Sequence, residues 1–578
     1  MARLTRRDFL KASALGMGAV AISTGLAGCV LDSDDKRRVD FTHGVASGDP
    51  LQDSVILWTR AVPERGSKVK VGWEIATDAE FVSVVRSGTA ETTEAHDFTI
   101  KVDAQGLMPG QRYYYRFRSS GATSPVGAAT TLPEGSVEQV RLAVVSCSNY
   151  PAGYFHVYRE VANQADLDAV VHLGDYIYEY SSDPDSYASE EAQALGRTFP
   201  ENNNRELLTL VDYRRRYAIY REDPDLQLAH QRLPFIVVWD DHEVANDTWR
   251  NGAENHDDSE GDFEQRKLAA LQAFFEWMPI RPVIEGNDEA IYRSFRFGDL
   301  VDLHMLDTRV IGRDQQLDYL NYLSEAGLNV DQFTADVTDP NRTLLGAEQR
   351  LWLQNKLATS TGRWQVLGQQ VLMGRMDLPA ELLLAIATET FDDLPVTLQE
   401  LATLKGMQLQ GMPLTEEQEA RISTAAPYNL DAWDGYQAER EVVLGMARQL
   451  DKNLVVLAGD THNAWANNLK DMYGNQVGVE FATASVSSPG LEDYLGLTDA
   501  TIAGAEKGIG LLVDGLDYLN INQRGYMVVT FTQEEARANW YFVDTVKSQE
   551  YTVDSSRSAA RRTLPGAGNR AVVPVQPT

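Results

Sequence analysis

The stretch AVVHLGDYIYEY, residues 169–180, decides the fold of most of this chain. It opens with an apolar run, which predicts a buried strand, and it ends in a polar cluster that begins at Asp175. Helical segments separate it from similar stretches, so we expect an α/β domain with a site at the carboxyl ends of its strands. Three other stretches repeat the form: VRLAVVSC (residues 140–147), LPFIVVWDDHE (233–243) and KNLVVLAGDTHNA (452–464).

A different pattern precedes this domain. Short alternating runs such as SVILWTR (residues 54–60) and RYYYRFRSS (112–120) are separated by turn residues. They predict a small all-β sandwich of the fibronectin or immunoglobulin kind. The expected organisation is an export signal at 1–29, a tether at 30–40, the β-sandwich at 41–133, the α/β domain at 140–555 and a loosely ordered tail at 556–578.

The first 29 residues indicate export. Arg6 and Arg7 precede a weakly apolar stretch that is too short to span a membrane, which is typical of a twin-arginine signal. The signal ends LAGC (residues 26–29), which resembles a lipoprotein cleavage box and predicts lipidation of Cys29. The alternative is an ordinary cleavage site beside a chance cysteine. We expect export by the Tat machinery to the periplasm or cell surface, with a membrane tether through Cys29.

Composition narrows the function classes. Hydrophobic residues make up 43% and charged residues 24% of the chain, as in ordinary globular proteins. The formal net charge of −32 argues against stable binding of nucleic acid, because a polyanion would be repelled. We expect a monomer.

The cysteine content leaves the role of one thiol to be explained. The chain has 2 cysteines, and lipidation of Cys29 would leave Cys147 without a partner for a disulfide. A lone thiol in an exported protein is either buried and inert or bound to something. Because twin-arginine substrates typically cross the membrane folded, often with a cofactor inserted, Cys147 is a candidate metal ligand.

Ligand-type side chains follow all four predicted strands. Each has an ordinary alternative when taken alone: a buried cysteine, a turn aspartate, a core tyrosine or a hydrogen-bonded histidine. Together they predict a metal site, since thiolate and phenolate favour a metal such as ferric iron, and Asp and Asn oxygens favour calcium or magnesium. The residues are Cys147, Asp175, Tyr178, Asp240, Asp241, His242, Asn246, Asp460, His462 and Asn463.

The motifs LGDYIYEY, WDDHEVAND and LAGDTHNAW, in this order, resemble the PhoD family of alkaline phosphatases within the calcineurin-like metallophosphoesterases. LDTR (residues 306–309), DAWDGY (431–436) and NQRGY (522–526) also look like motifs of that family. The resemblance covers nearly the whole mature chain. It implies one ferric iron and one or two calcium ions, with the iron bound by Cys147, Asp175, Tyr178 and His462.

The resemblance leaves one calcium ligand open. It implies calcium binding by Asp175, Asn246 and Asp460, with Asp175 bridging the two metals. However, DDHE (residues 240–243) also resembles the GNHE motif of broader relatives, which would put Asp241 in the ligand role.

The function implied is hydrolysis of phosphomonoesters, and also of phosphodiesters, by a metal-activated hydroxide. His242 would orient or protonate the leaving group, with Asp241 beside it, and Arg309 is a candidate to hold the phosphate. One alternative is a phosphodiesterase or phospholipase D-like enzyme that acts on lipids or cell-envelope polymers. Another is a lipid-anchored surface binding protein with an inactive site.

Overall fold

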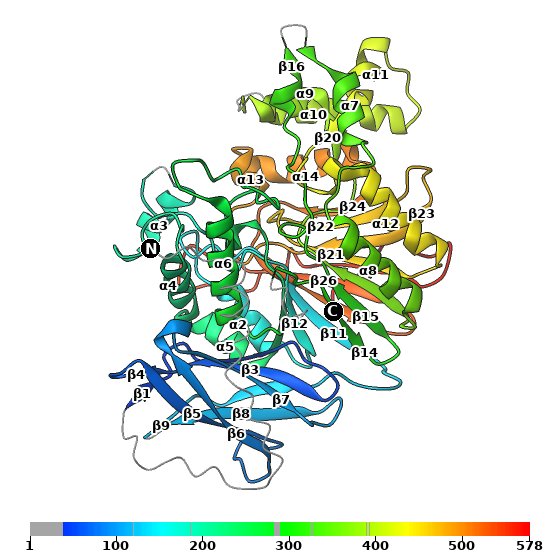
Figure 1. The fold of residues 1–578 in the computed structure, drawn as a ribbon. Coiled ribbons are helices and arrows are strands. Elements are labelled where there is room, and N and C mark those ends of the chain that lie inside the picture. The colour runs from blue at the N-terminus through cyan, green and yellow to red at the C-terminus, as the bar shows by residue number, and fades with distance from the viewer. Residues whose placement is uncertain are drawn as a thin grey trace.

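The computed structural model describes residues 38–578 except 120, 185, 283–288, 325–326, 389 and 392–393. The expected export signal and Cys29 therefore lie outside the described residues. Within the described part of the chain, no helix combines the length and the apolar character that crossing a bilayer requires. Two large sheets pack together, and helices lie on the outer side of each (Figure 1).

The first sheet contains the parallel neighbours β11, β12 and β13. β12 and β13 are wholly buried, as are all residues of β11 except Arg141, because helices and the second sheet cover both faces. The strands of this sheet, in spatial order, are β28 (Val573–Val575), β27 (Ala559–Thr563), β26 (Ala536–Phe542), β25 (Gly525–Phe531), β11 (Val140–Val145), β12 (Ala169–His172), β13 (Pro234–Val237), β2 (Val45–Gly48), β3 (Ser54–Arg60) and β7 (Thr99–Gln105).

The second sheet has β15, β18, β21 and β23 as parallel neighbours. It packs on the first sheet through one apolar core, and the buried indole of Trp540 in β26 donates to the carbonyl of Ala482 in β23 at 2.8 Å. In spatial order its strands are β14 (Arg293–Phe297), β15 (Val301–Met305), β18 (Trp364–Gly368), β21 (Leu454–Ala458), β23 (Gln476–Ala482), β22 (Ala464–Lys470) and β24 (Leu516–Asn520).

Helices cover the outer faces of the two sheets. The first sheet is covered by α2 (His156–Asn163), α4 (Leu210–Arg221), α5 (Pro224–Arg232) and α6 (Phe263–Trp277). The second sheet is covered by α8 (Gly346–Thr359), α12 (Gln437–Gln449) and α14 (Asp499–Leu512). This α/β architecture confirms the fold class predicted from the sequence.

The N-terminal β region is joined to the α/β domain through a shared sheet. β2 runs parallel to β13, with Phe235 opposite Gly48. A side chain at Gly48 would lie 2.4 Å from the carbonyl oxygen of Pro279, so only glycine fits this junction. β2, β3 and β7 enclose a separate apolar core with the second sheet of the sandwich, which contains β5 (Lys68–Ala76), β6 (Val84–Thr93), β8 (Arg112–Ser119), β9 (Ala122–Thr123) and β10 (Gly127–Thr130).

The expected loosely ordered tail is instead structured. β27 pairs antiparallel with β26, and β28 pairs with β27. Ala560 and Thr563 are buried, and Arg561 and Arg562 between them are partly exposed. The two consecutive arginines interrupt the alternation that would have predicted a strand in the sequence.

A helical module rises above α13 (Leu491–Tyr494) and α14 (Figure 1). Much of it is formed by residues 376–422, which are rich in Leu, Glu, Gln and Ala. Its helix α10 packs on α14 through apolar side chains of both. Its elements are β16 (Leu323–Ser324), β17 (Gly327–Leu328), α7 (Val330–Val337), β19 (Asp377–Pro379), α9 (Ala380–Ala387), α10 (Leu394–Leu409), α11 (Glu416–Ser423) and β20 (Ala425–Pro427).

Candidate active site

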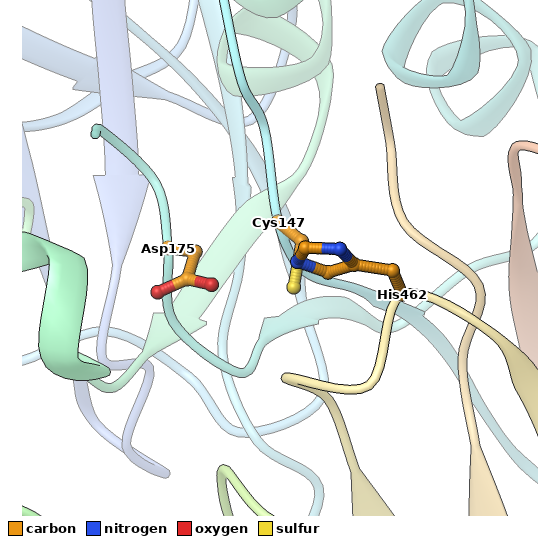
Figure 2. Close-up of side chains that lie close together, drawn as sticks. All are labelled: Cys147, Asp175 and His462. Atoms are coloured by element: carbon orange, nitrogen blue, oxygen red, sulfur yellow. The ribbon is translucent and has the colours of Figure 1, made fainter. Parts of the chain in front are cut away.

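The predicted ligand residues meet at the carboxyl ends of the parallel strands of both sheets. Cys147 follows β11, Asp175 follows β12, and His462 follows β21. Figure 2 shows these three side chains close together, each on the loop after its strand. The loop after β13 carries Asp240, Asp241 and His242 to the same place. The structure therefore brings together residues more than 300 positions apart in the sequence.

The backbone at these positions is strained. Cys147, Asp175, Asp460 and His462 all have positive φ, between 54° and 62°, which side chains with a Cβ rarely adopt. Such residues cost free energy and persist only where the surrounding structure fixes them, which is typical of functional sites. The strain thus falls on four of the predicted ligands.

One cluster combines a thiol, a carboxylate and an imidazole. Ligand atoms of Cys147, Asp175 and His462 all lie within 4.8 Å of one another, and all three side chains are buried. The hydroxyl of Tyr178 lies 3.2 Å from Asp175 Oδ2 and 3.2 Å from His462 Nε2. Sulfur, phenol, carboxylate and imidazole thus converge on one point.

The tautomer of His462 suits metal binding. Its Nδ1 lies 2.5 Å from the carbonyl oxygen of Pro489, and because a carbonyl only accepts, Nδ1 carries the proton. The neutral ring therefore presents the lone pair of Nε2 to the cluster. Burial lowers the pKa of His462 to about 3, which keeps the ring neutral.

A second cluster contains carboxylates. Oxygens of Asp240, Asp241 and Asp460 lie within 4.8 Å of one another, and Asp241 also forms a group with Asp175 and His242. Asp241 therefore connects the two clusters. All-oxygen surroundings of this kind suit a hard cation such as calcium.

Arg309 lies among the carboxylates of the second cluster. Its side chain is fully buried, and it donates to Asp240 at 2.5 Å, to Asp431 at 2.8 Å and to Asp460 at 3.1 Å. Asp241 lies 3.5 Å away on the same face. Because it donates to these carboxylates, Arg309 orients them, and its role in holding the phosphate stays a prediction.

Glu243 holds two of the loops in register. Its fully buried carboxylate accepts from the backbone N–H groups of Asp175 (3.0 Å), Tyr176 (2.6 Å) and Ile177 (3.2 Å) after β12. It also accepts from the N–H of Asp240 after β13, at 2.6 Å. This residue was missed in the sequence, where only its place in DDHE marked it.

His242 is paired with a second buried acid. Its Nδ1 lies 2.7 Å from Oε2 of Glu179, so that Nε2 remains available to the site. Burial lowers the pKa of His242, but the carboxylates of Asp241, Glu179 and Asp175 outweigh it and raise that pKa well above the usual value. Glu179 was overlooked because it lies within the tyrosine-rich run DYIYEY (residues 175–180).

Asn246 is less central than Asp241. Its side-chain amide donates to Glu254 at 2.9 Å, and its backbone N–H donates to Glu179 at 2.7 Å. The side chain of Asn246 is partly exposed. That of Asp241 is buried and belongs to two clusters, one with Asp240 and Asp460 and one with Asp175 and His242.

Buried carboxylate oxygens without hydrogen-bond partners indicate whether a metal ion fits this site. Oδ1 of Asp175, Oδ2 of Asp240 and Oδ1 of Asp241 are buried and accept no hydrogen bond from any residue that the structure describes. A buried carboxylate oxygen without a partner is costly, and coordination of a cation removes that cost. The donor types and the orphaned oxygens therefore fit metal ions.

The excess of negative charge in the site also indicates that it binds cations. Burial raises the pKa of Asp175 and Asp240 well above the usual value and that of Asp460 to about 7. Arg309 opposes the shift at Asp240 and Asp460, but one guanidinium does not neutralise the carboxylates around it. Further positive charge is needed for all of them to ionise.

Comparison with known proteins decides the family. A model of the PhoD-like phosphatase family matches residues 142–540, and a model of the N-terminal domain of PhoD-like phosphatases matches residues 27–133. The chain belongs to the PhoD-like phosphatase family. The resemblance predicted from the motifs is confirmed.

Individual relatives agree with this assignment. The PhoD-like chain is 37% identical to alkaline phosphatase D of Bacillus subtilis over 468 residues. This alignment covers 78% of this chain and 70% of that protein. A solved structure of PhoD is similar with a TM-score of 0.73 at 31% identity, covering 95% of this chain and 94% of that one. This PhoD-like protein is therefore a phosphoric ester hydrolase of the alkaline phosphatase type, with a metal-binding site.

Proposed function

We propose that this phosphatase hydrolyses phosphomonoesters, and phosphodiesters as well, at a site that binds one ferric iron and one or two calcium ions. The observation that carries the proposal is the set of orphaned oxygens on Asp175, Asp240 and Asp241 beside the thiol of Cys147 and the imidazole of His462. These three oxygens accept no hydrogen bond from the described residues, and the single charge of Arg309 does not neutralise the carboxylates around it.

The chemistry of the donors supports a division between the two metals. Cys147, Asp175, Tyr178 and His462 would hold the iron, because thiolate and phenolate favour a redox metal. Asp175, Asp241 and Asp460 would hold calcium through oxygen atoms. We assign Asp241 in preference to Asn246, because Asp241 is buried with an oxygen that accepts no hydrogen bond, whereas the side chain of Asn246 is partly exposed.

Bound cations would activate water and neutralise charge on the phosphoryl oxygens. The chain supplies the proton donor: the ring of His242, held at Nδ1 by Glu179, presents Nε2 toward the leaving oxygen. The ring of Tyr178 lies 4.2 Å from that of His242 and restricts its rotation. Arg309 fixes the carboxylates that flank them.

Elemental analysis of the purified protein, paired with activity before and after calcium chelation, tests this proposal. We expect about one iron per chain, and activity that chelation abolishes and calcium restores. Zinc or manganese in place of iron would refute the ligand assignment. Turnover of bis(p-nitrophenyl) phosphate with none of p-nitrophenyl phosphate would instead establish a dedicated phosphodiesterase.

Visible absorbance gives an independent readout. A ferric ion with phenolate and thiolate ligands should show a charge-transfer band. We expect Tyr178→Phe and Cys147→Ser to remove or shift this band, and Tyr187→Phe, which changes a tyrosine stacked on Tyr178, to leave it in place. A band that survives both ligand substitutions would contradict this iron site.

We also propose export through the Tat pathway and anchoring through Cys29. The twin arginines and the LAGC sequence support it. Replacing Arg6 and Arg7 with lysine should retain the protein in the cytoplasm. Cys29→Ser should release the exported enzyme from the membrane fraction, and unchanged fractionation would refute the anchor.

A further inference from the structure

The loop after β23 carries no predicted metal ligand, yet it lies directly behind the loops that do. Its residues 483–490, TASVSSPG, are all buried. The backbone N–H of Val486 donates to the carbonyl of Ser146 at 2.9 Å. The carbonyl of Pro489 accepts from Nδ1 of His462, as described above. This loop therefore packs against the thiol-containing cluster, and its side chains can reach the ligand atoms from the side away from the carboxylates.

Ser488 in this loop contacts one of the predicted iron ligands. Its side chain is fully buried, and its Oγ lies 2.7 Å from the hydroxyl oxygen of Tyr178 and 3.0 Å from the carbonyl oxygen of Cys147. A hydroxyl carries one proton, so Ser488 donates to one of these oxygens at a time. The carbonyl of Cys147 also accepts from the backbone N–H groups of Ser487 (3.3 Å) and Ser488 (3.4 Å). It therefore keeps hydrogen-bond partners when the hydroxyl of Ser488 donates to Tyr178.

A second buried serine lies against the other ligand that would bind as an anion. Oγ of Ser146 is 3.1 Å from Sγ of Cys147, and both side chains are fully buried. A thiolate has no proton and only accepts, so the hydroxyl beside it must donate. Hydrogen bonds to ionised groups are roughly twice as strong as those between neutral groups. The two serine hydroxyls are therefore held most firmly when Cys147 and Tyr178 are thiolate and phenolate, the forms that bind a metal.

We propose that these two serines set the Lewis acidity of the bound iron. Ser488 donates a hydrogen bond to the phenolate of Tyr178. Ser146 donates one to the thiolate of Cys147. The inference rests on the proposed function, and both serines are positioning residues because they act through the ligands. A hydrogen bond draws electron density away from a ligand atom, so the ligand donates less to the metal. The ion is then a stronger Lewis acid toward phosphate oxygens and is easier to reduce.

The visible spectrum of the metal-replete protein tests this role. We expect the charge-transfer band of the parent to move to longer wavelength in Ser488→Ala and in Ser146→Ala, because losing the hydrogen bond raises the energy of the ligand electrons. The reduction potential of the iron should fall in both variants for the same reason. Turnover of p-nitrophenyl phosphate should fall about tenfold. Iron content, measured by elemental analysis, should stay at about one per chain.

Ser487→Ala is the matched control. Ser487 is buried in the same loop, and its hydroxyl donates to the carbonyl of Asn149 at 2.8 Å. Its substitution removes a buried hydroxyl of the same kind but leaves the hydrogen bonds to both ligand atoms intact, so the band and the reduction potential should match those of the parent. Ser488→Thr keeps a hydroxyl at the decisive position and should restore the band to near the parental wavelength.

The outcomes separate this inference from the proposed function. An unchanged band and potential in Ser488→Ala and Ser146→Ala, with iron retained, would overturn the role of the serines while the iron site stands. An equal shift in Ser487→Ala would also overturn it, by showing that any change in this loop disturbs the site. Loss of iron from Ser488→Ala would assign that serine to metal retention instead. A parent protein without iron, or with iron but no band, would overturn the proposed metal site and this inference together.

Discussion

Glu179 accepts a hydrogen bond from Nδ1 of His242 at 2.7 Å and so fixes which nitrogen of the imidazole faces the metal site. The carboxylate is fully buried and also accepts from the backbone of Asn246. The pair combines a proton donor with the group that orients it, as a general acid needs.

His242→Ala should lower kcat by about 10²-fold for alkyl phosphates. The loss should be smaller for 2,4-dinitrophenyl phosphate, because a good leaving group needs no proton. Glu179→Gln should show the same dependence on the leaving group with a smaller loss, since glutamine keeps a hydrogen bond but not the charge. Steady-state kinetics with both esters measure this, and an equal loss for the two would exclude a role as general acid.

Arg309→Met should destabilise the metal-free protein by about 3–5 kcal/mol, because it leaves buried carboxylates without their counterion. Calcium should restore part of the lost stability by supplying positive charge at the same place. Thermal melts with and without calcium measure both effects. Arg421→Met, which breaks the partly exposed pair with Glu381, is the control and should cost less than about 1 kcal/mol. A variant unaffected by calcium would contradict the shared site.

Asp434→Asn should make the protein more stable above pH 7. Burial, partly offset by Arg440, raises the pKa of Asp434 to about 7, so the folded state disfavours its charge. The stability of the parent protein therefore falls as pH rises from about 4 to 7, and asparagine avoids this loss. The carboxylate accepts from the backbone N–H of Met376 at 2.8 Å, which asparagine can also do.

Melting temperatures across the pH range check this prediction. We expect the variant to melt about 1–3 °C higher at pH 8 and to match the parent at pH 4. A variant that is destabilised equally at both values would show that Asp434 is held as a carboxylate.

Deletion of residues 557–578 should lower the melting temperature and promote aggregation. It removes β27 and β28 and exposes the edge of β26, which pairs with β27 from Ala536 to Trp540. Light scattering during a thermal melt measures both effects. A truncated protein with the melting temperature of the parent would show that β27 and β28 contribute little to stability.

Much of the site was predictable because its residues directly follow apolar strands. Cys147, Asp175 and Asp460 each come within two or three residues of a strand end, and the carboxyl ends of parallel strands share an edge. The α/β fold class was predicted from the same apolar runs and the helical segments between them. The ligand types then indicated a metal site before any geometry was known.

Other features depended on tertiary contacts that no local pattern contains. Asp431 accepts a hydrogen bond from Arg309 across 122 residues of sequence, a contact that no local pattern could predict. Glu243 could not be distinguished from an ordinary helix-capping acid until the loop at Asp175 was placed beside it. The strand β27 was missed because its two consecutive arginines interrupt the apolar alternation that predicts a strand.

The large sheet has a consequence for how the chain acquires its structure. β2, from near the beginning of the described chain, pairs beside β13, whereas β25 near its end pairs beside β11. A growing chain on the ribosome therefore exposes an open edge at β11 until residues 525–531 are synthesised. Pairings so distant in sequence make folding slow, so the strand that carries Cys147 gains its second neighbour only after nearly the whole polypeptide has been synthesised.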